Sequence, residues 1–487
     1  MRSEDLFEAM GDIDEKEIEA ADNYRPKKKA PLKWVLPAAC AAAAVLLLLI
    51  GIPLIRNAQK NPNVPNTPGN EEGSYELKVL SAEYPEAVGG NLSAEEYMTD
   101  DARWDWLDEQ QKNYDASAAL QKDMENCYLS LMAQILASDE ENTVCSPLNA
   151  YMAFAMLAET ADGNTRKQIL DTLGVPDIKT LRKNTHALWS SNYADTPVLK
   201  SLLANSVWLN AAENYNEDTL KTLAHEYYAS SYRGVPGSDE MNAALQDWTN
   251  KNTGGLLKDY VKDLKLEPDT VLALVSTIYY KATWLNDFNK DENTRETFHG
   301  VKGDTTVDMM HNSDCSELFE SDRFTALSLG LNDSGSMHFF LPKDGVDINS
   351  LASDPDVLKA ISTEDDARRS YPMVNMSIPA FKVSCKTDLL DTMSALGMTD
   401  ALDPGRADFS PLKPDAAGLY VSAAEHAAFV EIDEQGVTGA AYTEIAMTKG
   451  AFFSDDPVDF VLDRPFLFII SGSDGSVLFS GIVRNID

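Results

Sequence analysis

The sequence predicts an α+β fold, because helical patterns come first in its globular part and strand patterns follow in no regular alternation. Between Leu120 and Leu136, apolar residues such as Met124 and Tyr128 recur at helical spacing. Near the end of the chain, Ser473-Asp-Gly475 separates two short apolar runs, which is a strong hairpin signal. Together these patterns favour mixed helices and antiparallel sheets over repeated βαβ units.

The remaining elements follow from local patterns in chain order. Helices are expected over 120–136, 148–159 and 242–252, and the last of these stops before Gly254-Gly255. Strands are expected over 271–280, 337–341, 374–378, 419–432, 466–470 and 476–479.

An uncharged segment from Trp34 to Ile55 predicts a transmembrane helix, since about 20 apolar residues span a bilayer. Arg25, Lys27–Lys29 and Lys33 precede it, so the positive-inside rule places residues 1–33 in the cytoplasm. A cleaved signal peptide would begin nearer residue 1 and have a shorter apolar part. We therefore expect a single-pass protein of the cell membrane with its globular domain outside the cell.

Beyond the expected anchor at 34–55, residues 56–115 are predicted to form an extracellular linker or stalk. Its first part is rich in Asn, Pro and Gly and has no periodicity. Residues 75–115 either pack on the following domain or extend the stalk. Residues 116–487 show no Pro/Gly-rich break and are expected to form one domain.

The formal net charge of −37 argues against binding to nucleic acid, which requires basic groups. The five cysteines show no metal-type spacing, so buried free thiols are expected. His299 and His311 with the acids between them resemble a metal site only weakly, and no cofactor is expected. Because a catalytic triad can be assembled from distant residues, a surface hydrolase stays a remote alternative.

The segment Phe429–Thr443 begins as a strand and continues into very small residues. Alternate positions from Val437 to Met447 are small or apolar and could lie on a core, whereas Tyr442 and Glu444 fall on the other face. Glycine and alanine make a poor permanent strand. The pattern therefore predicts a loop that can become a strand.

Over residues 116–487 the chain resembles the serpin family. The similar segments occur in the family's order and at its spacing: 142–150 with 153–157, 160–165 with Gln168, 204–209, 274–284, 307–310, 378–382, 396–398, 421–422 with His426, and 463–468. The resemblance implies the serpin fold, with three β-sheets, eight or nine helices and an exposed reactive loop. We expect a bacterial, membrane-anchored member of the family.

The resemblance also implies a function. A serpin is a serine-type endopeptidase inhibitor and not an enzyme: its loop is cleaved as a suicide substrate and inserts into the central sheet, trapping the acyl-protease. The expected partners are serine or cysteine proteases and the membrane, and the expected state is a monomer. A non-inhibitory serpin-fold interaction protein at the cell surface is the main alternative.

The hinge implied by the resemblance comprises Glu434, Gly436, Val437, Thr438, Gly439, Ala440 and Ala441. Val437 and Gly439 depart from the family's usual residues, but neither adds a charge or a proline, so insertion stays feasible. Counting from Glu434 places the reactive bond at Gly450–Ala451, and a loop one residue shorter places it at Lys449–Gly450. We favour Lys449, because its side chain can fill an acidic specificity pocket.

A polar cluster beneath the opening sheet is expected to contain Ser146, Asn149, Ser276 and His426. Asn149 stands where the family typically has serine, and Ser276 stands where it typically has asparagine. If the two residues touch, this exchange keeps one amide and one hydroxyl in contact. The alternative is two unrelated polar substitutions.

Overall fold

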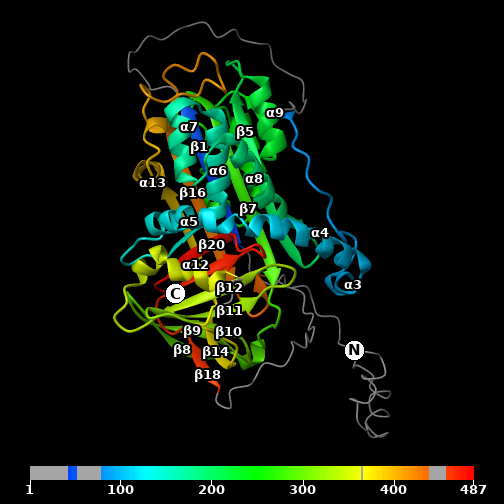
Figure 1. Ribbon diagram of the computed structural model, residues 1–487, viewed down its shortest axis with the longest axis vertical. Coiled ribbons are helices and arrows are strands. Elements are labelled where there is room, and N and C mark those ends of the chain that lie inside the picture. The colour runs from blue at the N-terminus through cyan, green and yellow to red at the C-terminus, as the bar shows by residue number, and fades with distance from the viewer. Residues whose placement is uncertain (1–41, 52–77, 363–365, 438–456, 487) are drawn as a thin grey trace. The chain divides into compact units, whose positions relative to one another are not determined.

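The central sheet of the molecule contains the longest strand among the described residues and residues 42–51 of the N-terminal apolar segment. The computed structural model describes residues 42–51, 78–362, 366–437 and 457–486 (Figure 1). Across the central sheet the order is β15 (Phe381–Asp388), β16 (Tyr420–Ile432), β1 (Ala42–Gly51), β7 (Thr270–Thr283), β5 (Leu199–Asn210), β6 (Ala229–Gly234) and β2 (Lys78–Leu80). Two short strands, β4 (Ala194–Asp195) and β17 (Gly436–Val437), pair with β5 and β7 respectively.

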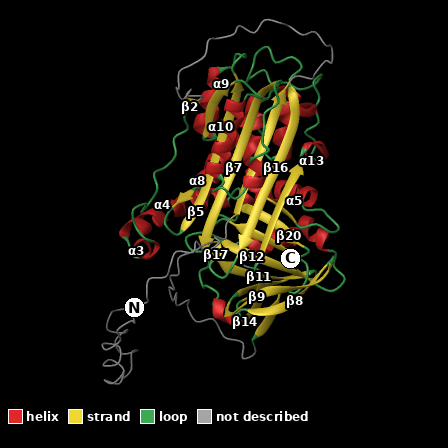
Figure 2. Ribbon diagram, turned by 180° about the vertical axis from the view of Figure 1, so that it is seen from behind, coloured by secondary structure: helices red, strands yellow, loops and turns green. Residues whose placement is uncertain are grey.

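Two smaller sheets complete the β structure of the described residues. The first runs β13 (Arg369–Ser370), β10 (Glu317–Glu320), β11 (Phe324–Gly330), β12 (Ser336–Pro342), β19 (Phe466–Ser471), β20 (Val477–Val483) and β3 (Thr143–Cys145). The second runs β18 (Val458–Val461), β14 (Met373–Pro379), β9 (Gly303–Cys315) and β8 (Thr294–Gly300). Figure 2 shows the long strands of the central sheet in front of the helices.

The helices lie mainly on one face of the central sheet (Figures 1 and 2). They are α3 (Ala94–Met98), α4 (Asp101–Ala118), α5 (Gln121–Ile135), α6 (Pro147–Thr160), α7 (Gly163–Thr172), α8 (Ile178–Asn192), α9 (Glu217–Glu226), α10 (Asp239–Asn252), α11 (Lys258–Val261), α12 (Pro355–Ile361) and α13 (Leu390–Ala395). Short 3₁₀ turns occur at Lys290–Glu292, Ile348–Ser353 and Asp400–Leu402.

Helix α6 is the centre of the core, and every one of its residues is buried. The two residues at its N-terminal end explain why the helix begins there. Ser146 caps it by accepting a hydrogen bond from the Asn149 amide, and Pro147 occupies the first turn, where no backbone donor is lost. The helix is rich in alanine and methionine, so it can pack closely beneath β1 and β7.

The α+β prediction is confirmed, with mixed helices and three sheets. The three helices expected from periodicity appear as α5, α6 and α10, and the six expected strands appear as β7, β12, β14, β16, β19 and β20. The Asp-Gly hairpin joins β19 to β20, and Gly475 has a φ of +83°, which glycine adopts without strain. Cys127 and Cys145 are buried free thiols, and Cys315 and Cys385 are half-buried ones.

The described residues before Ala118 pack on the domain. Arg103 of α4 forms an ion pair with Asp333 at 2.7 Å, and both side chains are nearly inaccessible to solvent. Tyr84 packs against Trp189 of α8, with ring centroids 5.7 Å apart.

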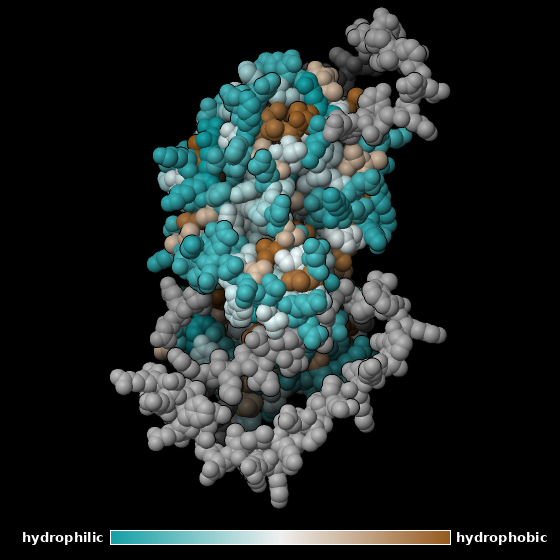
Figure 3. Space-filling model, turned by 90° about the vertical axis from the view of Figure 1, so that its right-hand side faces the viewer, coloured by the Kyte–Doolittle hydropathy of each residue, from teal (hydrophilic) through white to brown (hydrophobic). Residues whose placement is uncertain are grey.

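On the face seen in Figure 3, hydrophilic residues dominate among the described residues and hydrophobic areas are small.

The predicted transmembrane helix is wrong. Residues Ala42–Gly51, from the middle of the apolar segment, form β1, which lies inside the central sheet and pairs with β7 and β16. None of the helices within the described ranges has the length and hydrophobicity that crossing a bilayer requires. The expected location as a single-pass membrane protein is therefore contradicted.

The physical reason for the error lies in the two faces of β1. Ala44, Leu46, Leu48 and Ile50 join the main core, and Ala43, Val45, Leu47 and Leu49 join a second apolar cluster across the sheet. A strand buried on both faces has no polar side, so it appears as a continuous apolar run, like a membrane helix. Only the pairing partners distinguish the two.

Candidate functional site

The chain reverses direction where β16 ends. The Gly436 amide donates a hydrogen bond to the Asp433 carbonyl at 3.2 Å, and the Asp433 side chain accepts one from the Gln435 amide at 2.8 Å. After this turn, β17 pairs with β7 through Gly436–Thr283 and Val437–Ala282. The turn therefore directs the chain back along β7.

Trp284, which follows β7, fixes this turn by donating two hydrogen bonds to it. Its indole Nε1 donates to the Asp433 carbonyl at 2.9 Å, and its backbone amide donates to the Gln435 carbonyl at 3.3 Å. Gly436 has a φ of +105°, and a Cβ atom placed there would lie 2.5 Å from the Trp284 nitrogen. Only glycine fits this position without strain.

Glu434, within the turn, is anchored by residues that follow β7. Its carboxylate accepts a hydrogen bond from Asn293 Nδ2 at 2.6 Å and lies 3.9 Å from Lys290 Nζ. Its backbone carbonyl accepts from the Phe288 amide at 2.9 Å. The predicted hinge residue Glu434 thus ties the end of β16 to the segment that follows β7.

A second carboxyl group lies near the turn. Burial, together with the nearby charge of Asp433, raises the pKa of Asp287 to about 6. Asp287, beside the turn, therefore ionises at a higher pH than an exposed aspartate.

The four residues of the predicted polar cluster meet beneath the central sheet, and all are at most 2% exposed. Ser146 donates its backbone N–H to His426 Nε2 at 3.0 Å and its hydroxyl to the Leu478 carbonyl at 2.5 Å. Asn149 Nδ2 donates to Ser276 Oγ at 2.9 Å. The exchanged pair, an amide at the start of α6 and a hydroxyl on β7, is in direct contact.

His426 is neutral in this setting. Burial lowers the pKa of its imidazole to about 4. Since Nε2 accepts the Ser146 N–H, the neutral tautomer carries its proton on Nδ1. Nδ1 makes no hydrogen bond of good geometry. The nearby backbone of Val45 raises the pKa of His426 slightly and so opposes the larger effect of burial.

Strand β1 lies between the two sheet members of the polar cluster. Leu46 is paired with Ser276 on β7 and with His426 on β16. Its side chain is fully buried in the main core. This strand was not predicted from the sequence, because its only signal there is an apolar run that fits a buried strand as well as a helix.

The other predicted site residues lie outside the described residues. They are Thr438, Gly439, Ala440 and Ala441 of the hinge and Lys449, Gly450 and Ala451 of the reactive bond.

His299 and His311, which only weakly resemble a metal site in the sequence, contact different acidic residues. His299 Nδ1 contacts Asp304 at 2.9 Å, whereas His311 contacts Glu296 at 3.0 Å and the hydroxyls of Thr294 and Ser377. Among the described residues, no group of three or more His, Cys, Asp or Glu side chains is arranged to hold a metal.

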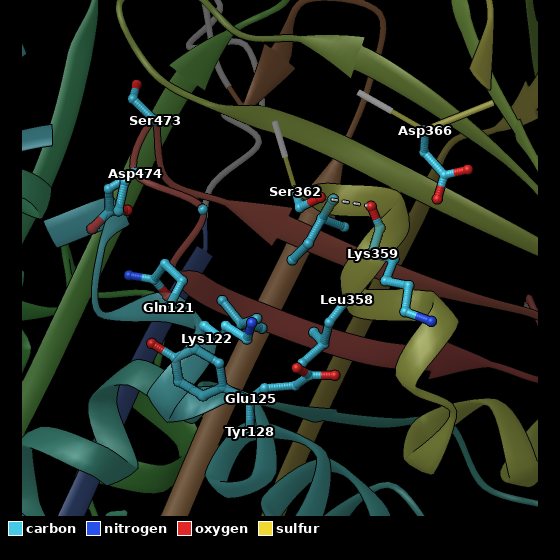
Figure 4. Close-up of a pocket in the computed structure, with 14 residues that line it drawn as sticks. Gln121, Lys122, Glu125, Tyr128, Leu358, Lys359, Ser362, Asp366, Ser473 and Asp474 are labelled. Carbon is cyan, nitrogen blue, oxygen red and sulfur yellow. Dashed lines mark hydrogen bonds between the residues drawn. The ribbon is translucent and has the colours of Figure 1, made fainter. Parts of the chain in front are cut away.

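A cavity of about 450 Å³ lies elsewhere, between α5, α12 and the β19–β20 hairpin (Figure 4). Asp474, at one side of it, is buried and accepts hydrogen bonds from Ser117, Ser191 and Asn192. Its carboxylate is thus engaged in holding α4, α8 and the hairpin together. No hinge residue lines this cavity, and the hinge remains the candidate site.

Comparison with protein families gives one match over most of the chain. The family described as "Serpin (serine protease inhibitor)" matches residues 123–486. Among curated proteins, Serpin-Z1C of Triticum aestivum is 29% identical over 367 residues, which cover 72% of this chain and 91% of that protein.

Solved structures show the same similarity. The thermophilic serpin tengpin in its native state superposes with a TM-score of 0.64 at 25% identity, covering 75% of this chain and 94% of that one. The native stressed conformation of Arabidopsis AtSerpin1 gives a TM-score of 0.63 at 23% identity, over 77% of this chain and 98% of that one, and shows the shared fold.

Proposed function

The chain belongs to the serpin family, and from this premise we propose that it inhibits serine-type endopeptidases as a suicide substrate and is not itself an enzyme. The nucleophile of the protease attacks a peptide bond of the segment after Val437 and forms an acyl ester with release of the new amino terminus. The acylated segment then enters the central sheet, carries the protease with it and distorts the protease before water can release it.

One observation carries this proposal. Strand β17 already pairs with β7 immediately after the turn at Gly436. The first residue pairs of an added strand are therefore formed in the intact chain. Trp284, Asn293 and Phe288 hold the turn that starts this strand, so the direction of growth along β7 is fixed.

The bait is proposed to be Lys449–Gly450, with Gly450–Ala451 as the alternative. A trypsin-like protease would bind Lys449 through an ion pair in its specificity pocket. A cysteine protease is a second class of partner, because it forms an equivalent thioester. The polar cluster of Ser146, Asn149, Ser276 and His426 is proposed to govern how readily the strand between β7 and β16 is exchanged.

The principal alternative is a non-inhibitory serpin-fold interaction protein. This alternative is favoured because β1 already occupies the position between β7 and β16 in the central sheet. A non-inhibitory role would follow if β1 never leaves. The solved structure of human thyroxine-binding globulin in complex with its ligand shares the fold, with a TM-score of 0.63 at 23% identity.

The test is to incubate the full chain with a panel of serine and cysteine proteases. Inhibition predicts a covalent complex stable in SDS and a released C-terminal peptide whose first residue identifies the bond. Cleavage without a complex would favour the non-inhibitory alternative, and turnover of a substrate by the chain alone would favour a hydrolase.

Two variants sharpen this test. Lys449→Ala should abolish inhibition of trypsin-like proteases and spare elastase-like ones; the reverse pattern would move the bait to its neighbours. Gly439→Arg should convert the inhibitor into a substrate, because insertion would bury an unpaired charge. Lys302→Arg, on the exposed β8–β9 turn, introduces the same side chain away from the hinge and should leave inhibition unchanged.

A further inference from the structure

β1 and β17 occupy the same strand position along β7. Both run antiparallel to β7: Val437 is opposite Ala282, and Ala42 is opposite Tyr280. Only Lys281 separates the two pairings. Any growth of β17 along β7 therefore meets β1 after one residue.

β1 is paired on both sides over its whole length. Its register with β7 runs from Ala42–Tyr280 to Gly51–Thr270, and its register with β16 runs from Ala42–Val430 to Gly51–Tyr420. From Ala43 to Ile50, every side chain is at most 5% exposed. The backbone and side chains of β1 thus fill the space that an added strand would take.

We infer that β1 is an autoinhibitory strand, an internal occupant of the sheet that has to leave before the chain can trap a protease. This inference rests on the proposed inhibitory function. Two strands cannot share one set of backbone partners on β7 and β16, so occupation by β1 and insertion after Val437 exclude each other.

β1 lies far in sequence from the two strands with which it pairs. β1 joins β2 through residues 52–77, and the other strands of the central sheet come much later in the chain. Withdrawal of β1 therefore breaks its pairings with β7 and β16 and no pairing between other strands. The strands it separates, β7 and β16, would close or accept a replacement.

The chemistry of the position favours β1 over the segment after the hinge. A strand that continued in the register of β17 would place Glu444 where Leu47 now lies, opposite Glu425 and Val275. Glu425 already contacts Lys386 at 3.1 Å and Tyr260 at 3.3 Å. Like charges directly opposite each other destabilise a strand pair, whereas Leu47 is buried among apolar side chains. β1 is the better-suited occupant until cleavage frees the competing strand.

A reversible disulfide tests the inference. Val45 lies opposite Ala427, and both face the same apolar cluster, so the full chain carrying Val45→Cys and Ala427→Cys can lock β1 to β16. The oxidised chain should form at least tenfold less SDS-stable protease complex than the reduced chain and should be cleaved as a substrate. The reduced chain serves as its own folding control.

A matched control lies in the same row of the sheet. Ala204 is opposite Thr277, and Thr277 is also opposite Val45, so Ala204→Cys with Thr277→Cys locks β5 to β7 without touching the contested position. Oxidation of this control should leave complex formation unchanged. Equal complex formation by the oxidised and reduced Val45/Ala427 variant would overturn the inference and leave the proposed function intact.

Amide hydrogen exchange separates failure of the inference from failure of the function. In the intact wild-type chain, the amides of residues 43–50 should be strongly protected. After the bait is cut by any protease, they should exchange at least a hundredfold faster, because the cut segment replaces β1. Trapped protease together with unchanged protection would overturn the inference, because β1 would not have left. Unchanged protection without trapped protease would overturn the inhibitory function. Loss of protection without any trapped protease would overturn only the inhibitory function.

Discussion

Asn149 Nδ2 donates a hydrogen bond to Ser276 Oγ at 2.9 Å, and this bond joins the start of α6 to the middle of β7. Both residues are almost fully buried. The contact links the helix at the centre of the core to β7, the strand beside which the proposed mechanism inserts the cut segment. Its strength therefore bears on both stability and function.

The first prediction concerns this pair. Asn149→Ala should lower the free energy of unfolding by about 1–3 kcal/mol, because it leaves the buried Ser276 hydroxyl without its partner. The exchange Asn149→Ser with Ser276→Asn should recover most of the loss, because an amide and a hydroxyl again face each other. Urea denaturation of the single and double variants measures this coupling. If the loss in the exchanged double variant equals the sum of the losses in the Asn149→Ser and Ser276→Asn single variants, the two residues have no interaction energy.

The second prediction concerns Leu46. Leu46→Ala removes a fully buried side chain from β1 and should weaken its hold in the sheet by about 2–5 kcal/mol. Protease trapping should become faster, since β1 leaves more readily. Leu318→Ala in β10 is a suitable control, because that side chain is also buried but lies outside the central sheet. Faster trapping in both variants would point to a general loss of stability.

The third prediction concerns His426 and pH. Burial lowers the pKa of its imidazole from 6.5 to about 4, so the unfolded chain takes up a proton before the folded chain does. The contribution of His426 to the free energy of unfolding is fully present above pH 6.5. It is lost as pH falls towards 4, by roughly 3 kcal/mol in all. His338, with a pKa lowered to about 3, contributes in the same direction.

His426→Gln isolates the first histidine, because glutamine can still accept the Ser146 N–H but does not titrate. The difference in thermal stability between wild type and variant, measured from pH 7 to pH 4, should shrink as pH falls. A constant difference across this range would contradict the low pKa.

The fourth prediction concerns Asp287. Its pKa is raised from 3.8 to about 6, so ionisation opposes folding. The cost is absent below pH 3.8 and grows as pH rises through 6, which is opposite in sign to the effect of His426. Asp287→Asn should therefore stabilise the chain at pH 7.5 and have little effect at pH 4. Melting curves at the two pH values measure this, and an equal effect at both would refute it.

The fifth prediction concerns Gly436. Gly436→Ala should destabilise the turn by about 1–3 kcal/mol, because alanine is strained at φ +105° and its Cβ would clash with Trp284. Gly345→Ala is the control: its φ is +80°, but nothing lies within 4 Å of the added atom. Hydrogen exchange at the Trp284 amide should increase only in the Gly436 variant. Similar exchange in both would mean that the turn tolerates the added atom.

Local patterns predicted much of the fold correctly. The helical spacing around Met124 and Tyr128 and the Asp-Gly signal before Ser476 each depend on neighbours in the chain, and α5 and the β19–β20 hairpin follow them. The contact between Asn149 and Ser276 could be anticipated only through resemblance to the family. No local rule brings two residues so far apart in sequence together.

The sequence by itself determined that residues 42–51 would avoid water, because every side chain there is apolar or glycine. Only the tertiary structure decided how. The backbone donors and acceptors of an apolar run can be satisfied within a helix or by neighbouring strands, and composition does not distinguish the two. Here β7 and β16 provide partners on both sides, and the cores above and below the sheet bury both faces of β1.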